Sequence, residues 1–77
     1  MRILIVEDEV PLARQIAAEL TEDGHDPTAV HSGEAAVDEV SKRPFDLIVL
    51  DVRLPGIDGF ELLRRLRTQH LPVAYCY

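Results

Sequence analysis

Three acidic residues follow apolar segments that are typical of buried strands. Glu7 and Asp8 come directly after RILIV, and Asp51 comes directly after DLIVL. Carboxylates held close together repel one another, and burial raises the cost of their charge. A hard divalent cation offsets this repulsion, because Mg²⁺ prefers oxygen ligands. A carboxylate can also act as a nucleophile and form an aspartyl phosphate. If the fold brings the three acids together, they indicate a metal site or a centre for metal-assisted phosphoryl transfer.

Two segments are expected to form strands that are buried on both faces. Arg2–Val6 (RILIV) and Asp46–Leu50 (DLIVL) are apolar runs without polar alternation, which is typical of the inner strands of parallel sheets. Asp26–Val30 (DPTAV) is a weaker strand signal, and its proline favours a sheet edge. The segment LPVAYCY has the composition of the start of another strand. The chain therefore offers four strand segments.

The segments between these strands carry apolar residues at helical spacing. Leu12, Ala13 and Ile16 are core candidates in the first of them, and Gly24 is well placed to end that helix. Ser32 is the expected N-cap of the next helix. The expected helices span Val10–Thr21, Glu34–Lys42 and Gly59–Gln69.

The alternation of strands and helices predicts an α/β protein with a parallel sheet and right-handed crossovers. In such a sheet the carboxyl ends of the strands lie along one edge, where ligands bind. Glu7, Asp8 and Asp51 meet there if the two inner strands are neighbours. Acids at strand ends also serve as helix caps and solvated loop residues, so this alternative stays open for Glu7, Asp8 and Glu9 taken singly.

Composition narrows the classes of function. The chain has 77 residues, 8 of them Lys or Arg and 14 Asp or Glu, for a net charge of -6. This length favours one domain at most, and the acidic balance argues against binding nucleic acid. A single cysteine, Cys76, allows no internal disulfide. No stretch approaches the ~18 apolar residues of a membrane span, and the start MRILIVEDE is unlike a signal peptide. We therefore expect a soluble, cytoplasmic protein.

The acidic motifs resemble those of the receiver domain of two-component response regulators. The stretches that carry the resemblance are IVEDE and DLIVLDVRLPGIDGFELLRRLR, and it spans Met1 to Val73. The resemblance implies the flavodoxin-like receiver fold and phosphorelay signal transduction. It implies that Asp51 accepts a phosphoryl group from a sensor histidine kinase, a phosphotransfer protein or a small phosphodonor. Among receivers, the sequence is most similar to the OmpR/PhoB type, which precedes a DNA-binding domain.

The same resemblance assigns roles to further residues. It implies that Asp8 is a direct Mg²⁺ ligand and that Glu7 acts mostly through a metal-bound water. Asp51 and the backbone carbonyl of Arg53 complete the implied metal ligands. The loop that shapes the rim of the site is implied to contain Pro55 and Gly59.

Parts of the receiver pattern are missing from this sequence. The family has five strands and five helices, with a switch Ser/Thr after the fourth strand and a Lys after the fifth. The Ser/Thr position falls on Tyr77, and the Lys has no counterpart. We therefore expect residues 1–77 to be a truncated receiver without an output domain, prone to self-association through an exposed sheet edge around Val73 to Tyr77. The alternative is a non-signalling fragment that binds Mg²⁺ or acts as a kinase decoy.

Two other classes of site fit the acids less well. A Mg²⁺-dependent nuclease or topoisomerase-like site, or a phosphatase of the Asp-x-Asp type, requires an acid two residues after the strand-end aspartate. That position is Arg53, which argues against both. His25, His31 and His70 are too scattered to suggest a metal site and are expected on the surface or in loops.

Overall fold

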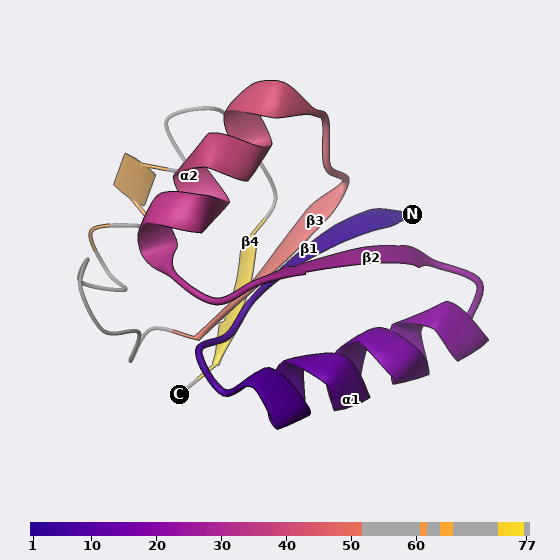
Figure 1. Ribbon diagram of the computed structural model, residues 1–77. Helices are drawn as coiled ribbons and strands as arrows, with labels where there is room; N and C mark the ends of the chain where they lie inside the picture. Colours follow the sequence, from indigo (N-terminus) through magenta and orange to yellow (C-terminus); the bar gives the residue numbers. More distant parts are fainter. Residues whose placement is uncertain (52–60, 62–63, 66–72, 77) are drawn as a thin grey trace.

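A four-stranded parallel sheet forms the centre of the fold, with the strand order β2-β1-β3-β4 (Figure 1). The computed structural model describes residues 1–51, 61, 64, 65 and 73–76, with residues 51 and 73–76 described through their backbone. β1 and β3 are hydrogen-bonded neighbours, which confirms the condition for the acids to share one edge. β2 lies at an edge of the sheet, as its proline indicated. The strands span Arg2–Val6 (β1), Asp26–Val30 (β2), Leu47–Asp51 (β3) and Val73–Cys76 (β4).

β3 begins and ends one residue later than the sequence predicted. Asp46 is held just before the ladder, because its N–H donates to the Arg2 carbonyl at 2.7 Å. Its carboxylate also accepts the Arg2 N–H at 2.7 Å. The ladder between β1 and β3 starts with the pair Ile3 and Leu47. The expected range Asp46–Leu50 is therefore wrong by one residue at each end, and Asp51 is the last residue of the strand.

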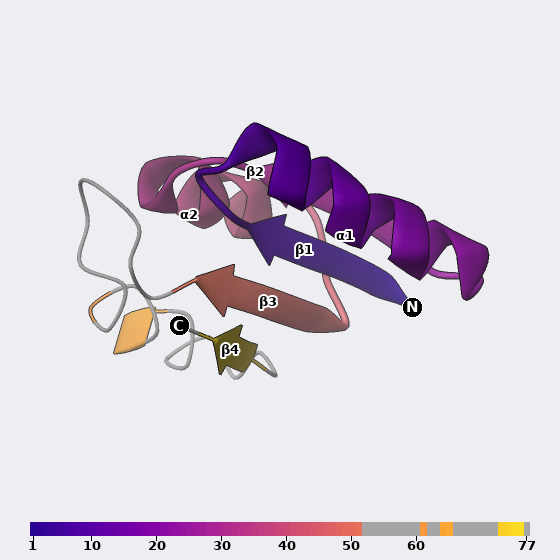
Figure 2. The same ribbon diagram turned by 90° about the horizontal axis from the view of Figure 1, so that it is seen from below.

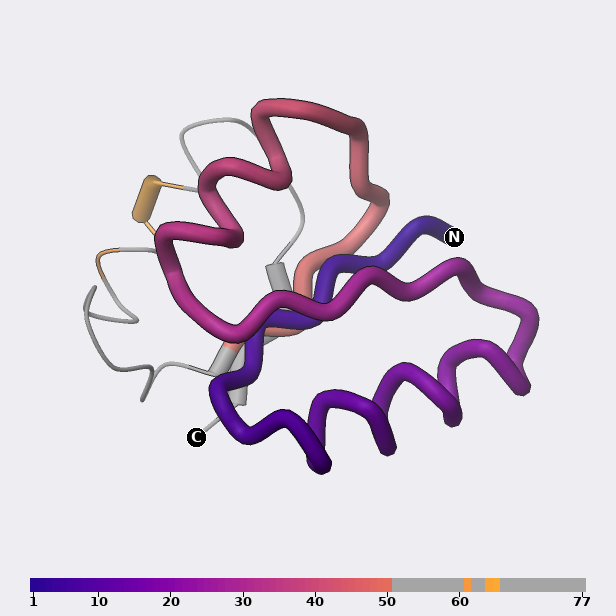
Figure 3. Tube along the Cα trace, in the orientation of Figure 1, coloured from indigo at the N-terminus to yellow at the C-terminus, as the bar shows by residue number. Residues whose placement is uncertain are grey.

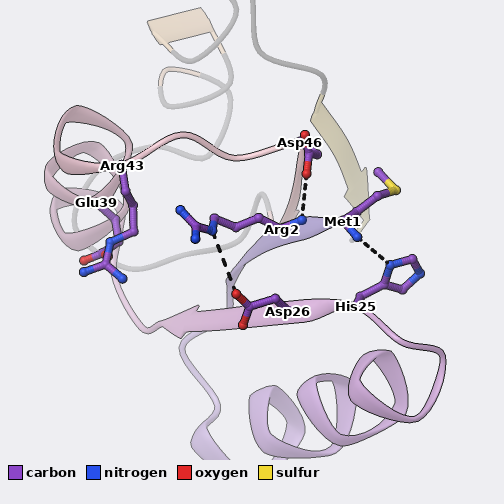
Figure 4. Close-up of polar contacts among 7 residues, drawn as sticks. All are labelled: Met1, Arg2, His25, Asp26, Glu39, Arg43 and Asp46. Atoms are coloured by element: carbon purple, nitrogen blue, oxygen red, sulfur yellow. Dashed lines mark hydrogen bonds and ion pairs between the residues drawn. The ribbon is translucent and has the colours of Figure 1, made fainter.

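Polar contacts at the amino ends of the strands hold them in register (Figure 4). The Asp26 N–H donates to the Met1 carbonyl at 2.8 Å. The Arg2 guanidinium lies 3.9 Å from the Asp26 carboxylate, and the N-terminal ammonium of Met1 lies 3.3 Å from Nδ1 of His25. Together with Asp46, these residues tie β1 to both of its neighbours. A register fixed at this end also fixes which residues lie level at the carboxyl ends.

The helices α1, Val10–Glu22, and α2, Gly33–Lys42, lie on opposite faces of the sheet (Figures 1 and 2). α1 runs one residue further than expected, and it is followed by Gly24 at a φ of +87°, a conformation that favours glycine. Ala13 is fully buried, as expected. Leu12 was wrongly expected in the core, because 39% of it is exposed.

Residues of β1 and β3 form the core on the α2 side of the sheet. Side chains alternate between the two faces of a strand, so Leu4 and Val6 face α2 while Ile3 and Ile5 face the other way. Ile3, Leu4, Ile5 and Val6 are all at most 2% exposed, which confirms that β1 is buried on both faces. Val37 and Val40 of α2 pack against the cluster. Its buried members are Leu4, Val6, Ala36, Phe45, Ile48 and Leu50.

Two expectations lie wholly or partly outside the described residues. Glu61, Arg64 and Arg65 are helical, and both arginines pair with Glu61. The rest of the helix expected over Gly59–Gln69 lies outside the described part of the chain. The side chains of the sheet edge expected to self-associate, residues 73–77, also lie outside it.

Two ion pairs lie along α2 and its C-terminal end. The Lys42 ammonium lies 2.8 Å from the Asp38 carboxylate. The Arg43 guanidinium lies 3.0 Å from the Glu39 carboxylate. The hydrogen bond to Asp38 is the main cause that raises the pKa of Lys42 above its ordinary value. Because both members of the first pair are exposed, water and salt screen it, and it adds little to stability.

Replacing Ser32 with alanine is expected to lower the free energy of unfolding by about 1 kcal/mol. The Ser32 hydroxyl oxygen accepts the Ala35 N–H at 3.1 Å, which satisfies an N–H at the start of α2. In a domain of this size, such a loss lowers the melting temperature by about 4–8 °C. Thermal unfolding followed by circular dichroism measures the shift.

The matched control for Ser32→Ala is Ser41→Ala near the end of the same helix. The Ser41 hydroxyl donates to the Asp38 carbonyl at an exposed position. Alanine has a higher helix propensity than serine, so this substitution is expected to be neutral or slightly stabilising. Equal melting temperatures for the two variants would contradict the capping role of Ser32.

Candidate functional site

The carboxyl ends of β1 and β3 bring Glu7 and Asp51 to the same level of the sheet. Val6 pairs with Leu50 as the last pair of the ladder. Glu7 and Asp51 each follow that pair by one residue, and neighbouring strands lie about 4.8 Å apart. From this edge the chain continues from β1 into α1 and from β2 into α2 (Figure 3). The edge is thus the place where parallel α/β sheets bind ligands.

Glu7 is buried, which is unusual for a carboxylate. The residue is 7% exposed and is the only buried charged residue in the part of the chain that the structure describes. Its N–H donates to the Val30 carbonyl at 3.0 Å, so the backbone holds it against β2. Burying a charge requires a compensating partner or a metal ion. The interpretation of Glu7 as a solvated loop residue is therefore wrong.

Asp8 lies between β1 and α1 and is exposed to solvent. The helix begins directly afterwards, where the Ala13 N–H donates to the Glu9 carbonyl at 2.9 Å. Glu9 is the N-cap residue of α1 but makes no side-chain capping hydrogen bond. The alternative that the Glu9 side chain serves as a helix cap is therefore wrong. Asp8, beside the buried Glu7, is open to a ligand that arrives from solvent.

Asp51 is placed by its backbone, between β1 and β4. It is the last residue of β3 and lies opposite Cys76 of β4. The carboxyl side chain of Asp51 and the whole of Arg53, Pro55 and Gly59 lie outside the described residues. Within the described part of the chain, no three His, Cys, Asp or Glu residues form a group that could hold a metal ion. The complete set of metal ligands stays a prediction.

His31 belongs to the same edge, a place that was not predicted for it. Its ring nitrogen Nδ1 lies 3.0 Å from the backbone carbonyl of Glu7. The residue is exposed, as expected for a surface histidine, and it directly follows β2. Its place after a predicted strand was the available signal, because that position puts it at the carboxyl edge.

Among the helices that the structure describes, none has the length and the apolar composition of a membrane-spanning segment.

Comparison with curated proteins finds response regulators. The chain is 49% identical over 71 residues to the transcriptional regulatory protein TcrA of Mycobacterium tuberculosis, which covers 92% of this chain and 28% of TcrA. It is 45% identical over 67 residues to the response regulator ArlR of Staphylococcus haemolyticus, covering 87% of this chain and 31% of ArlR. The chain therefore spans less than a third of the length of these relatives.

Comparison with solved structures finds receiver domains. The receiver domain of the Francisella response regulator 1452 has a TM-score of 0.88 and 32% identity, covering 96% of this chain and 63% of that one. The chemotaxis response regulator CheY4 of Vibrio cholerae has a TM-score of 0.91 and 26% identity, covering 96% and 65%. These likenesses confirm the flavodoxin-like fold predicted from the resemblance. Since residues 3–76 match the family described as the response regulator receiver domain, the chain belongs to that family.

Proposed function

We propose that the chain accepts a phosphoryl group on Asp51 in the presence of Mg²⁺, as a step in a phosphorelay. The observation that carries the proposal is the burial of the Glu7 carboxylate at the level of Asp51 on the neighbouring strand. Acids held at the same level of neighbouring strands repel one another, and a divalent cation between them offsets this repulsion. Membership of the receiver family supports the same chemistry.

The chemistry of the donor set fits Mg²⁺. Glu7, Asp8, Asp51 and the carbonyl of Arg53 offer oxygen atoms, which a hard divalent cation prefers. A similar structure, the response regulator TrrA of Thermotoga maritima, was solved in complex with Mg(2+)-BeF, with a TM-score of 0.87 and 31% identity to this chain. When bound, Mg²⁺ would supply positive charge that offsets both the acids and the oxygens of an incoming phosphoryl group.

In the proposed reaction, a carboxylate oxygen of Asp51 attacks the phosphorus atom of the donor. A bond forms between this oxygen and phosphorus as the bond from phosphorus to the leaving group breaks. With a sensor histidine kinase or a phosphotransfer protein, the leaving group is a histidine ring nitrogen. With acetyl phosphate, it is the acetate oxygen. The proposed part of Glu7 and Asp8 is to orient the cation, and that of Pro55 and Gly59 is to shape the rim.

Incubation with acetyl phosphate and MgCl2, followed by intact-mass measurement, tests this proposal. The folded chain is expected to gain one phosphoryl group, and an excess of EDTA is expected to prevent the gain. Hydroxylamine, which cleaves acyl phosphates, should remove the adduct. An adduct that forms equally well in EDTA would contradict the role of Mg²⁺. A folded chain that binds Mg²⁺ but gains no adduct would support the non-signalling alternative.

A further inference from the structure

The backbone carbonyl of Glu7 is held by the ring of a residue 24 positions away. Nδ1 of His31 lies 3.0 Å from this oxygen. A carbonyl oxygen only accepts hydrogen bonds, so Nδ1 must carry the proton and donate it. The neutral ring is then fixed as the Nδ1–H tautomer, whereas Nε2 keeps its lone pair.

This contact begins where the sheet ladder stops. The ladder between β1 and β2 ends with the pair Val6 and Val30, and the Glu7 N–H still donates to the Val30 carbonyl. One more step of a parallel ladder would bring the Ser32 N–H to the Glu7 carbonyl. Ser32 instead opens α2, with its side chain accepting the Ala35 N–H. The His31 ring therefore supplies a donor at the point where β2 turns away.

The carbonyl of Glu7 and the N–H of Asp8 belong to one planar peptide unit. The hydrogen bond to the Glu7 carbonyl therefore sets the orientation of the Glu7–Asp8 peptide plane, which contains the Cα atom of Asp8. On the far side of Asp8, the Glu9 carbonyl is fixed by the Ala13 N–H at the start of α1. Asp8 and Glu9 together thus lie between two anchored peptides, although the side chain of Asp8 is exposed.

We propose that His31 is a positioning residue for the acidic edge. Its Nδ1–H holds the Glu7–Asp8 peptide so that both carboxylates keep the orientation that Mg²⁺ binding requires. This role rests on the proposed function of the site. His31 binds neither the cation nor the phosphoryl group; it acts through the backbone of Glu7. Groups that orient metal ligands in this way strongly affect metal affinity.

His25, at the amino edge of the sheet, is expected to have the opposite ring tautomer and serves as an internal control. Its Nδ1 lies 3.3 Å from the N-terminal ammonium of Met1, which has no lone pair to accept a proton (Figure 4). Nδ1 of His25 must therefore be the acceptor, and the proton of its neutral ring lies on Nε2. The two histidines are expected to be opposite tautomers in the same molecule.

Nitrogen-15 NMR of the histidine rings tests the hydrogen bond directly. The spectra are recorded at a pH high enough that the ring nitrogen signals no longer change with pH. The expected result is protonated Nδ1 in His31 and protonated Nε2 in His25, with His31→Ala and His25→Ala used to assign the signals. A His31 ring protonated mainly on Nε2 would overturn the proposal. This measurement needs neither Mg²⁺ nor a phosphodonor.

Titration with Mg²⁺ alone, followed through backbone amide shifts, tests the positioning role. His31→Ala is expected to weaken Mg²⁺ binding by roughly 10-fold. His31→Asn should bind nearly as well as the wild type, because the asparagine Nδ2–H can take the place of Nδ1–H. His25→Ala, remote from the edge, should leave the affinity unchanged. A merely structural role would instead change the melting temperature without rescue of the affinity by asparagine.

The outcomes separate this inference from the function on which it rests. If the wild type binds no Mg²⁺, the proposed function fails and the positioning role fails with it. If the wild type binds Mg²⁺ and His31→Ala binds it equally well, the proposed function stands and the positioning role is overturned. If His31→Ala does not fold, two other measurements test the positioning role: the tautomer of the His31 ring in the wild type and the Mg²⁺ affinity of His31→Asn. Weak binding by His31→Asn would then count against the proposal.

Discussion

Replacing Asp51 with asparagine is expected to abolish the phosphate adduct completely. Asparagine has nearly the same shape, but its neutral amide is not the nucleophile that a carboxylate is. Acetyl phosphate with MgCl2, followed by intact-mass measurement, should give an adduct on the wild type and none on the variant. The readout is nearly all-or-none, which makes this the prediction with the largest effect on activity.

The same substitution is expected to preserve the fold or stabilise it slightly in the absence of Mg²⁺. Asp51 lies level with the buried Glu7 on the neighbouring strand, so removing its charge relieves repulsion between the two acids. A melting temperature at or above that of the wild type would show that the loss of the adduct is chemical. A large drop would mean that the Asp51 side chain has a structural role instead.

Asp46→Asn is the matched control on the same strand segment. Asp46 lies at the amino edge of the sheet, where its carboxylate accepts the Arg2 N–H at 2.7 Å. The asparagine carbonyl can still accept this hydrogen bond, so the fold should survive and the adduct should form as in the wild type. An adduct that persists on Asp51→Asn, mapped to Glu7 or Asp8, would show that the acceptor has been assigned wrongly.

Replacing Leu4 with alanine is expected to lower the free energy of unfolding by about 2–5 kcal/mol. Leu4 is fully buried in β1, an inner strand, within the cluster that includes Ile48 and Leu50. The substitution removes buried apolar surface and leaves a cavity that neighbours on two strands and a helix can fill only in part. Small proteins have total stabilities of about 5–15 kcal/mol, so the loss threatens the folded state itself.

Urea unfolding measures this loss as a lower midpoint at an unchanged slope. Leu12→Ala is the matched control, because it removes the same atoms from a residue that is 39% exposed. Its midpoint should shift much less than that of Leu4→Ala. Equal shifts would contradict the assignment of Leu4 to the core and of Leu12 to the surface.

Local patterns in the sequence predicted most of the elements. Uninterrupted apolar runs correctly identified β1 and β3 as inner strands. Burial on both faces was wrongly expected for β3, because Leu47 and Val49 are only partly buried. Ser32 was correctly predicted as the N-cap of α2, since its hydroxyl acts within a few residues of itself. The ends of β3 were missed by one residue. The beginning of β3 depends on hydrogen bonds between Asp46 and Arg2, 44 positions apart, and its end depends on the pairing of Asp51 with Cys76 of β4.

The candidate site was predictable only in part. The strand-end positions of Glu7, Asp8 and Asp51 suggested a common edge, and the family resemblance gave their proposed roles. The burial of Glu7 was not predictable, since the same residue after a strand could equally well be solvated. Leu12 shows the opposite error, because it was expected in the core and is exposed.

By itself, the sequence determined the family, the alternation of strands and helices, and the presence of acids at two strand ends. Only the tertiary structure decided that β1 and β3 are neighbours, that Glu7 is buried level with Asp51, and that the His31 ring holds the Glu7 carbonyl. The physical reason is the range of the interactions. Helical spacing, capping and apolar runs act over a few residues, whereas strand pairing and the His31 hydrogen bond join residues more than twenty positions apart.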